Sequence, residues 1–111
     1  MESFGASRTI GARIRAAREG LGLTIEDLAH MTEMDKTNIG RIERGASTSV
    51  RTLLMIAVAL ETDPGDLLRG LGFDDLPPGT RILGRDDYLA YRDEMDRQRP
   101  RFHIRANRRA R

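Results

Sequence analysis

The sequence has no cysteine, few aromatic residues and no long apolar run. Without cysteine the chain has no disulfide, no thiolate metal ligand and no cysteine nucleophile, which suits a reducing compartment. Aromatic residues make up 5% of the chain against 39% apolar residues overall, so the expected core is aliphatic. The longest apolar run, "LLMIAVAL" at residues 53–60, is too short to cross a bilayer, and the first residues do not form a signal segment. We therefore expect a cytoplasmic protein.

Basic and acidic residues are unevenly distributed along the chain. Residues 1–70 hold 9 basic and 10 acidic side chains, whereas residues 71–111 hold 10 basic and 7 acidic ones. Residues 97–111 carry seven Arg and no acidic residue. Such an end has three interpretations: a solubilising tail, an arm along DNA phosphates or the minor groove, or a segment that folds on a protein partner.

Apolar spacing and capping residues predict five helices within residues 9–70. In the first, Ile10, Ile14, Ala17 and Leu21 form a single apolar stripe. The first helix is expected to begin near Thr9. The second has Thr24 as its N-cap, in a capping box with Asp27, and the third has Asp35. One of residues 47–49 caps the fourth, and Asp63 caps the fifth, with Pro64 in its first position. Beyond residue 70, Gly and Pro indicate a linker or a turn-rich arm.

The third of these segments, residues 36–44, has two different faces. Ile39 and Ile42, with Met34 before them, are apolar at helical spacing. The polar positions between them are Lys36, Thr37, Asn38 and Arg41. A DNA-reading helix needs this combination, an apolar back that holds it on the domain and short polar or basic side chains that reach base edges. An ordinary solvated helix face is the alternative interpretation.

Four motifs in fixed order resemble the phage Cro/repressor-like (Xre-type) helix-turn-helix family. They are "IGARIRAAREGLGLT" from residue 10, "LA" at 28–29, "IGRIERG" at 39–45 and "LLMIAVAL" at 53–60. The resemblance covers residues 10–69. It implies an all-α, five-helix phage-repressor-like domain over residues 9–70, followed by a C-terminal extension, residues 71–111. It also implies that the third helix lies in the major groove of double-stranded DNA.

The resemblance assigns roles to particular residues. Base-reading positions are Lys36, Thr37 and Arg41, and phosphate-contacting positions are Asn38, Arg44, Ser47 and Thr48. The first backbone N–H groups of the second helix would bind a phosphate. Arg18 and Glu43 match a structural ion pair behind the recognition helix. Arg13, Lys36, Arg41, Arg44 and Arg51 are candidates for one basic face.

Two positions depart from the family pattern. Ile25 stands where the family often has glutamine, so a phosphate or supporting contact is lost there. Glu33 stands in the inter-helix turn, where the family favours glycine. If the turn requires a left-handed residue, Glu33 costs about 1 kcal/mol of stability.

The extension and the fifth helix carry the candidates for self-association. One helix-turn-helix unit reads only a few base pairs, so a homodimer on two half-sites is expected. The candidate dimer contacts are Leu67, Leu68, Tyr88, Leu89, Tyr91 and Met95. The last four belong to "RDDYLAYRDEMDRQR", residues 85–99, which is a candidate sixth, amphipathic helix.

These observations favour a sequence-specific transcriptional regulator, a repressor that occupies a palindromic operator as a dimer. The alternative is an antitoxin that represses its own promoter and binds a partner toxin through residues 75–111. A membrane-surface role for the basic end is weaker, because only Phe102 and Ile104 could anchor it. His30 and His103 lack metal-ligand spacing, and no nucleophile stands with a base, so we expect neither a metal, a cofactor nor an enzyme.

Overall fold

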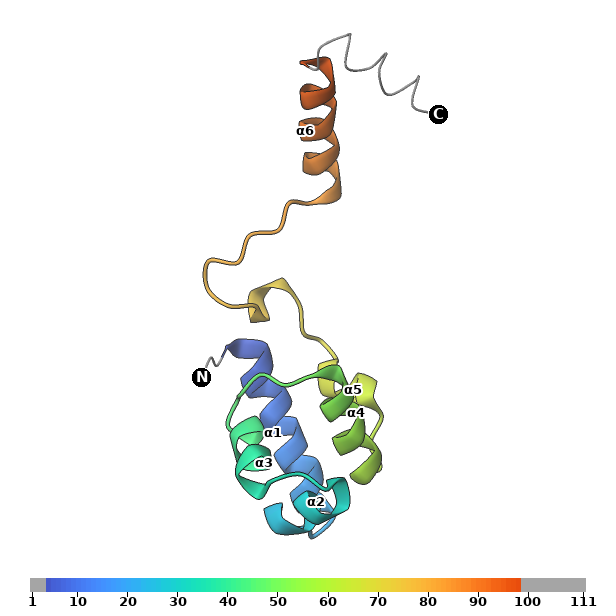
Figure 1. Ribbon diagram of the computed structural model, residues 1–111. Coiled ribbons are helices and arrows are strands. Elements are labelled where there is room, and N and C mark those ends of the chain that lie inside the picture. The colour runs from blue at the N-terminus through green and yellow to red at the C-terminus, as the bar shows by residue number, and fades with distance from the viewer. Residues whose placement is uncertain (1–3, 99–111) are drawn as a thin grey trace, which may run out of the picture. The chain divides into compact units, whose positions relative to one another are not determined.

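The computed structural model describes residues 4–98, and this part of the chain is all-α (Figure 1). Five helices come first: α1 (Gly5–Gly20), α2 (Ile25–Thr32), α3 (Lys36–Glu43), α4 (Val50–Ala59) and α5 (Pro64–Leu68). A short 3-10 turn, η1 (Phe73–Asp75), and a sixth helix, α6 (Arg85–Arg97), follow. The expected fold class, five helices and a sixth in the extension, is confirmed.

The described residues divide into two compact units, residues 4–79 and residues 80–98. The first contains α1–α5 and η1, and the second contains α6. The first unit continues beyond residue 70 because η1 packs against α1. A Cβ placed on Gly5 would lie 3.3 Å from the Asp75 carbonyl oxygen, so the two segments are in close contact.

Four of the helix starts are stabilised by side-chain caps. The Thr24 hydroxyl accepts the Asp27 N–H at 3.0 Å, and the Asp27 carboxylate accepts the Thr24 N–H at 2.8 Å. The hydrogen bond from the Thr24 N–H is the main reason why the pKa of Asp27 is lowered. Asp35, Ser49 and Asp63 cap α3, α4 and α5 by accepting a backbone N–H at 2.8–3.1 Å. The predicted starts of α2 to α5 are therefore confirmed.

Helix α1 begins about one turn earlier than the apolar stripe predicts, at Gly5 instead of near Thr9. Its N-cap residue, Phe4, makes no side-chain capping hydrogen bond. The additional turn is instead in contact with the loop before α4, because buried Ser7 has its hydroxyl 3.4 Å from the Ser47 hydroxyl. That contact joins residues far apart in the sequence, so local spacing could not indicate it.

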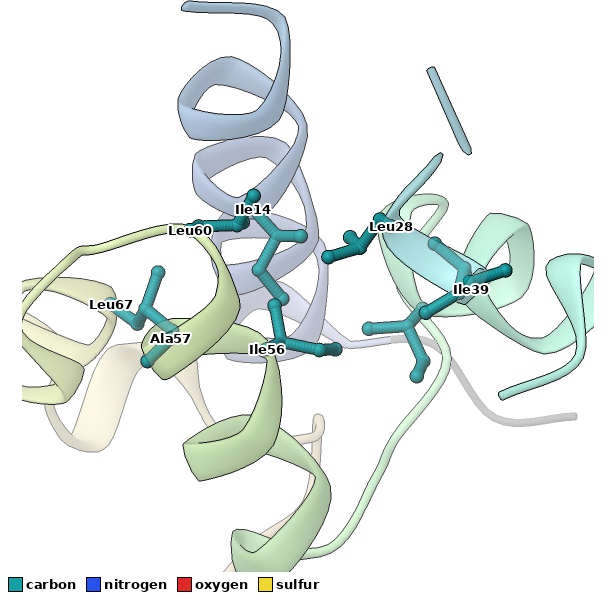
Figure 2. Close-up of a cluster of buried hydrophobic side chains, with 9 residues drawn as sticks. Ile14, Leu28, Ile39, Ile56, Ala57, Leu60 and Leu67 are labelled. Atoms are coloured by element: carbon teal, nitrogen blue, oxygen red, sulfur yellow. The ribbon is translucent and has the colours of Figure 1, made fainter. Parts of the chain in front are cut away.

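The core of the first unit is aliphatic, as the composition predicts. It consists of Ile14, Leu28, Ala29, Ile39, Ile42, Ile56, Ala57, Leu60 and Leu67 (Figure 2). Every helix from α1 to α5 contributes at least one of these side chains. Burial of each large aliphatic side chain contributes about 1.5–3 kcal/mol, so this shared core holds the short α2, α3 and α5 in place.

The backbones of α1 and α3 are in close contact at Gly11, which is buried. A Cβ on Gly11 would lie 2.3 Å from the Ile42 carbonyl oxygen and 2.6 Å from the Glu43 carbonyl oxygen. Real Cβ atoms do not approach backbone oxygens so closely. Glycine is therefore required for α3 to lie at its present distance from α1.

The turn between α2 and α3 requires a left-handed residue at Glu33. Its φ and ψ are 54° and 40°, and its N–H donates to the His30 carbonyl at 3.3 Å. The left-handed region brings Cβ close to the following carbonyl, which costs a non-glycine residue about 1–2 kcal/mol. The left-handed conformation that was considered for Glu33 is confirmed, and its cost to stability stays a prediction.

Glu33→Gly is expected to raise the free energy of unfolding by about 1 kcal/mol in urea titrations. Glu61, which follows α4, has the same φ of 54° and serves as a matched site, so Glu61→Gly should stabilise similarly. Glu33→Ala removes the carboxylate but keeps Cβ, so it should not stabilise the fold. Equal gains from Glu33→Ala and Glu33→Gly would assign the strain to the charge and contradict the conformational explanation.

Candidate nucleic-acid interface

One face of α3 is buried in the first unit and the opposite face is exposed. Ile39 and Ile42 are exposed by no more than 2%, and Gly40 between them is also buried. The exposed polar residues on and just after the helix are Lys36, Thr37, Asn38, Arg41 and Arg44. The structure therefore places all three predicted base-reading residues on an accessible surface.

Lys36 is paired with an acidic residue that sequence analysis did not connect with it. Its Nζ lies 3.5 Å from Oε1 of Glu26 in the first turn of α2, and both side chains are about two-thirds exposed, at 64% and 68%. An ion pair as exposed as this contributes at most about 1 kcal/mol. Lys36 can exchange Glu26 for a base edge or a phosphate at little cost.

The guanidinium group of Arg44 lies close to the backbone of α3. A Cβ on Gly40 would be 3.2 Å from Nη1 of Arg44, so a larger residue at position 40 would crowd this side chain. Among the ion pairs between described residues, none includes Arg41 or Arg44. Both guanidinium groups are suited to an anionic ligand such as phosphate.

The start of α2 is less favourable to a phosphate than expected. Its first turn contains Glu26 and Asp27, and the Asp27 carboxylate already accepts the Thr24 N–H. Two carboxylates at this helix end repel an anion and offset the favourable helix dipole. The loop before α4 is more suitable, because Ser47 is exposed and Thr48 is half-buried beside it.

The ion pair expected between Arg18 and Glu43 is present, and it is buried. Nε of Arg18 donates to Oε2 of Glu43 at 2.7 Å, and Nη2 donates to Oε1 at 2.9 Å. Nη1 donates to the Leu23 carbonyl at 2.7 Å, and the two side chains are only 8% and 5% exposed. The hydrogen bonds to Glu43 raise the pKa of Arg18 above its usual value. The pair fixes the end of α3 to α1, and it faces the protein instead of solvent.

The comparisons with known proteins agree with this geometry. Residues 14–67 match the family model described as Helix-turn-helix. The restriction-modification controller protein C.AhdI from Aeromonas hydrophila is 34% identical over 54% of this chain and 92% of its own, with a TM-score of 0.52. The P22 c2 repressor, solved with a synthetic operator, is 32% identical over 56% and 96%, with a TM-score of 0.52. The biofilm regulator SinR, solved with DNA, is 28% identical over 53% and 97%, with a TM-score of 0.51.

The chain belongs to the helix-turn-helix family. A search of the curated proteins gave no match. The Xre-like, phage-repressor type of helix-turn-helix that the sequence motifs indicate is confirmed by the family match and by these structural neighbours. The matched range extends from the middle of α1 to α5 and includes the turn at Glu33 and the whole of α3, whereas α6 lies outside it.

Arg13, one of the candidates for a basic face, is hydrogen-bonded to the end of α5. Its Nη1 donates to the carbonyl oxygens of Asp66, Leu67 and Arg69 at 3.2, 3.1 and 2.8 Å. These carbonyl oxygens lie at the carboxyl end of α5, and the last carbonyls of a helix have no hydrogen-bond donor within the helix. Arg13 therefore stabilises the end of α5, a role that no local sequence signal indicates because the partners are more than 50 residues away.

The prediction that Leu67 is a dimer contact is wrong. It is 3% exposed and belongs to the core of the helix-turn-helix domain, so its side chain is not available to a partner. Leu68 next to it is 52% exposed. On α6, Tyr88, Tyr91 and Met95 are about half exposed, and Leu89 is of intermediate burial.

The described part of the chain adds two negative findings. Between residues 4 and 98, no group of three or more His, Cys, Asp or Glu residues is placed to hold a metal ion. Across the same range, no helix is long and apolar enough to cross a membrane. His103 and the Arg-rich end lie outside the described residues, so the three interpretations of that end stay predictions.

Proposed function

We propose that this protein is a sequence-specific DNA-binding transcriptional regulator, a repressor that occupies a palindromic operator as a dimer. The observation that carries the proposal is the exposed face of α3, where Lys36, Thr37 and Arg41 are presented by a helix whose back is fixed in the core. SinR and the P22 c2 repressor, both solved with DNA, share the fold and support the proposal.

The three side chains suit base edges in different ways. Lys36 and Arg41 can donate to guanine O6 and N7, and the Arg41 fork can do so with two hydrogen bonds. The methyl group of Thr37 can contact a thymine methyl. Because α3 is held by buried residues on its other face, these groups approach DNA from a fixed direction, which base readout requires.

Phosphate contacts would then orient the domain on the duplex. Arg44 at the end of α3, Asn38 on its exposed side, and Ser47 and Thr48 in the following loop are the proposed contacts. Such contacts add affinity without sequence preference, and they make binding strongly dependent on salt. Two copies bound to half-sites about 34 Å apart would double the number of base contacts and of phosphate contacts, which is why a dimer is proposed.

Lys36→Ala and Arg41→Ala are each expected to weaken binding to the preferred operator by about 1–3 kcal/mol and to relax the preference over scrambled DNA. The operator is sought first in the DNA upstream of the protein's own gene. Binding of the full chain is measured by fluorescence anisotropy over a series of salt concentrations. A change restricted to sequence preference would identify these residues as base readers.

Arg15→Ala is the matched control for Arg41→Ala. Arg15 is an exposed arginine on α1 that pairs with Glu19 at 3.2 Å, so its loss removes the same charge away from α3. Arg15→Ala should leave the sequence preference unchanged. If Lys36→Ala and Arg41→Ala behave like Arg15→Ala, or if the protein prefers no site in a wider genomic selection, then α3 does not read sequence.

An antitoxin is the second candidate function. Helix α6 exposes Tyr88, Tyr91 and Met95, which is the kind of apolar surface that a protein partner covers. An antitoxin would co-purify with the product of a small neighbouring gene, and that product would be toxic when expressed alone. A regulator without a toxin would purify free of such a partner and still bind its operator.

A further inference from the structure

Helix α6 has an apolar stripe but contains no buried residue. Tyr88, Tyr91 and Met95 are 45%, 56% and 47% exposed, and the two Tyr rings contact each other with centroids 6.4 Å apart. An isolated helix of 13 residues is only marginally stable in water. The stripe therefore needs a partner surface for α6 to persist.

The spacing of this stripe is that of a helix-pairing seam. Tyr88, Tyr91 and Met95 follow one another at intervals of three and four residues, so they occupy the a, d and next a positions of a heptad. These positions lie along one side of the helix because residues three, four and seven apart share a face. A second helix with the same spacing could pack its own stripe against it.

The charges beside the seam differ in sign on its two sides. Arg85 and Arg92 occupy the e positions on one side, whereas Asp87 and Glu94 occupy the g positions on the other. In the sequence, Arg99 continues the basic series five residues after Glu94, although it lies outside the described residues. The two flanks of the stripe are therefore electrostatically complementary to each other.

We propose that α6 pairs in parallel with α6 of a second copy of this chain, and that this pair is the dimerisation element. In a parallel pair, each g residue faces the e residue five positions later on the other helix. Asp87 then faces Arg92 of the partner subunit, and two-fold symmetry forms this pair twice. An antiparallel pair would place acidic flank against acidic flank, bringing Asp87 near Glu94 of the partner subunit.

The parallel arrangement fits the proposed function, on which this inference rests for its biological role. It brings the amino-terminal ends of the two α6 helices together, so both linkers leave from one point. In each chain, residues 76–84 join η1 to α6, and this segment spans about 30 Å when it is fully extended. Two such linkers allow the helix-turn-helix domains to reach half-sites about 34 Å apart.

Charge reversal tests the pairing and its direction in the full-length chain. Asp87→Arg alone and Arg92→Glu alone each turn both inter-helix attractions into repulsions, so each should weaken self-association by at least about tenfold. An equimolar mixture of the two variants restores opposite charges at both contacts. Sedimentation equilibrium should show heterodimers in the mixture, with an affinity within about threefold of the unaltered chain.

Three results would overturn the proposal. The first is that the single variants associate as tightly as the unaltered chain, and the second is that the mixture associates no better than either variant alone. Tighter self-association of Asp87→Arg would indicate antiparallel pairing, in which position 87 meets Glu94 of the partner subunit. Recovery in the mixture also shows that the single changes do not act by unfolding α6, since both altered helices are still present there.

Cysteine trapping provides a second measurement that does not depend on tight association. The chain has no cysteine, so a single introduced one reports one position only. Tyr91→Cys places a thiol in the seam, where it meets its own copy in a parallel pair, whereas Ala90→Cys places one on an exposed side. Mild oxidation should cross-link Tyr91→Cys chains at least about tenfold faster, because adjacent thiols have a high effective concentration. Equal rates would contradict the proposed seam.

The two proposals fail separately. If the α6 charges have no effect on self-association while Lys36→Ala still relaxes the DNA preference, dimerisation through α6 is wrong and the regulator stands. The dimer would then use another surface, such as Leu68 on α5. If association follows the α6 charges but no DNA preference exists, the pairing stands and the proposed function fails.

Discussion

Gly11→Ala is expected to lower the free energy of unfolding by about 3 kcal/mol, although alanine is the better helix former. The added Cβ would lie 2.3 Å from the Ile42 carbonyl oxygen, which belongs to the backbone of α3 and cannot rotate away. Helices α1 and α3 must separate to relieve this overlap. Their separation would also loosen the packing of Ile14 and Ile39 in the core.

Gly20→Ala is the matched control in the same helix. Gly20 is the last residue of α1, and nothing lies within 4 Å of a Cβ placed there. This change should stabilise the fold by about 0.5–1 kcal/mol, because alanine loses less backbone entropy than glycine. Urea unfolding followed by circular dichroism at 222 nm measures both variants. Equal behaviour of Gly11→Ala and Gly20→Ala would show that α1 and α3 are not in backbone contact at Gly11.

Gly11→Ala should also change DNA binding if α3 reads DNA as proposed. The variant is compared with the unaltered chain at a temperature where both are fully folded. A displaced α3 no longer presents Lys36 and Arg41 at the base edges, so sequence preference should fall even in the folded fraction. Retained preference in a strongly destabilised variant would mean that α3 keeps its place and that the strain is relieved elsewhere.

The sequence predicts those parts of this fold that depend on local interactions. The caps at Thr24, Asp35 and Asp63 lie within three residues of the N–H groups that they accept, so each is visible in a short window. The apolar spacing of Ile39 and Ile42 likewise assigns the inner face of α3 without knowledge of its neighbours. The strained turn at Glu33 could be predicted because the family pattern favours glycine there.

The errors fall on residues whose partners are distant in the sequence. Arg13 was a candidate for one basic face, and its hydrogen bonds to the carbonyls at the end of α5 were not predicted, because these partners are more than 50 residues away. Leu67 and Leu68 are adjacent residues of the same type, and only the orientation of α5 on the core decides that Leu67 is buried and Leu68 is exposed. Ser7 extends α1 by meeting the loop at Ser47.

Among the candidate site residues, the sequence predicts exposure better than contacts. Lys36, Thr37 and Arg41 are exposed, as the face pattern of α3 indicates. The neighbour of Lys36 on α2, Glu26, was not anticipated, because the crossing of α2 and α3 decides which side chains meet. Electrostatic arguments about a surface therefore need the fold first, even where each residue's exposure follows from spacing.

Arg18→Met is expected to lower the free energy of unfolding by about 3–5 kcal/mol, and Glu43→Leu by a similar amount. The two groups are joined by two short hydrogen bonds and are less than 10% exposed, so removing one leaves the other charged and buried without its partner. The raised pKa of Arg18 has the same origin, because Glu43 stabilises the charged guanidinium. An arginine side chain does not lose its proton in proteins, so Arg18 cannot avoid the penalty by becoming neutral.

The double variant, Arg18→Met with Glu43→Leu, should cost less than either single change. Its two apolar side chains occupy a similar volume without any buried charge, and such replacements of buried ion pairs are often neutral or stabilising. One loss remains, because the Leu23 carbonyl would lose the hydrogen bond from Nη1 of Arg18, worth about 1 kcal/mol. The coupling energy between the two positions should therefore exceed about 3 kcal/mol.

Chemical unfolding of the four proteins in this cycle measures the coupling directly. The exposed pair of Arg15 and Glu19 on α1, which is 3.2 Å apart, gives a comparison cycle in which the coupling should stay below about 1 kcal/mol. Additive losses at Arg18 and Glu43 would mean that the pair is solvated in solution and does not fix α3 to α1. A large coupling, with DNA preference retained in the double variant, would show that the pair positions α3 through the fold and takes no part in reading DNA.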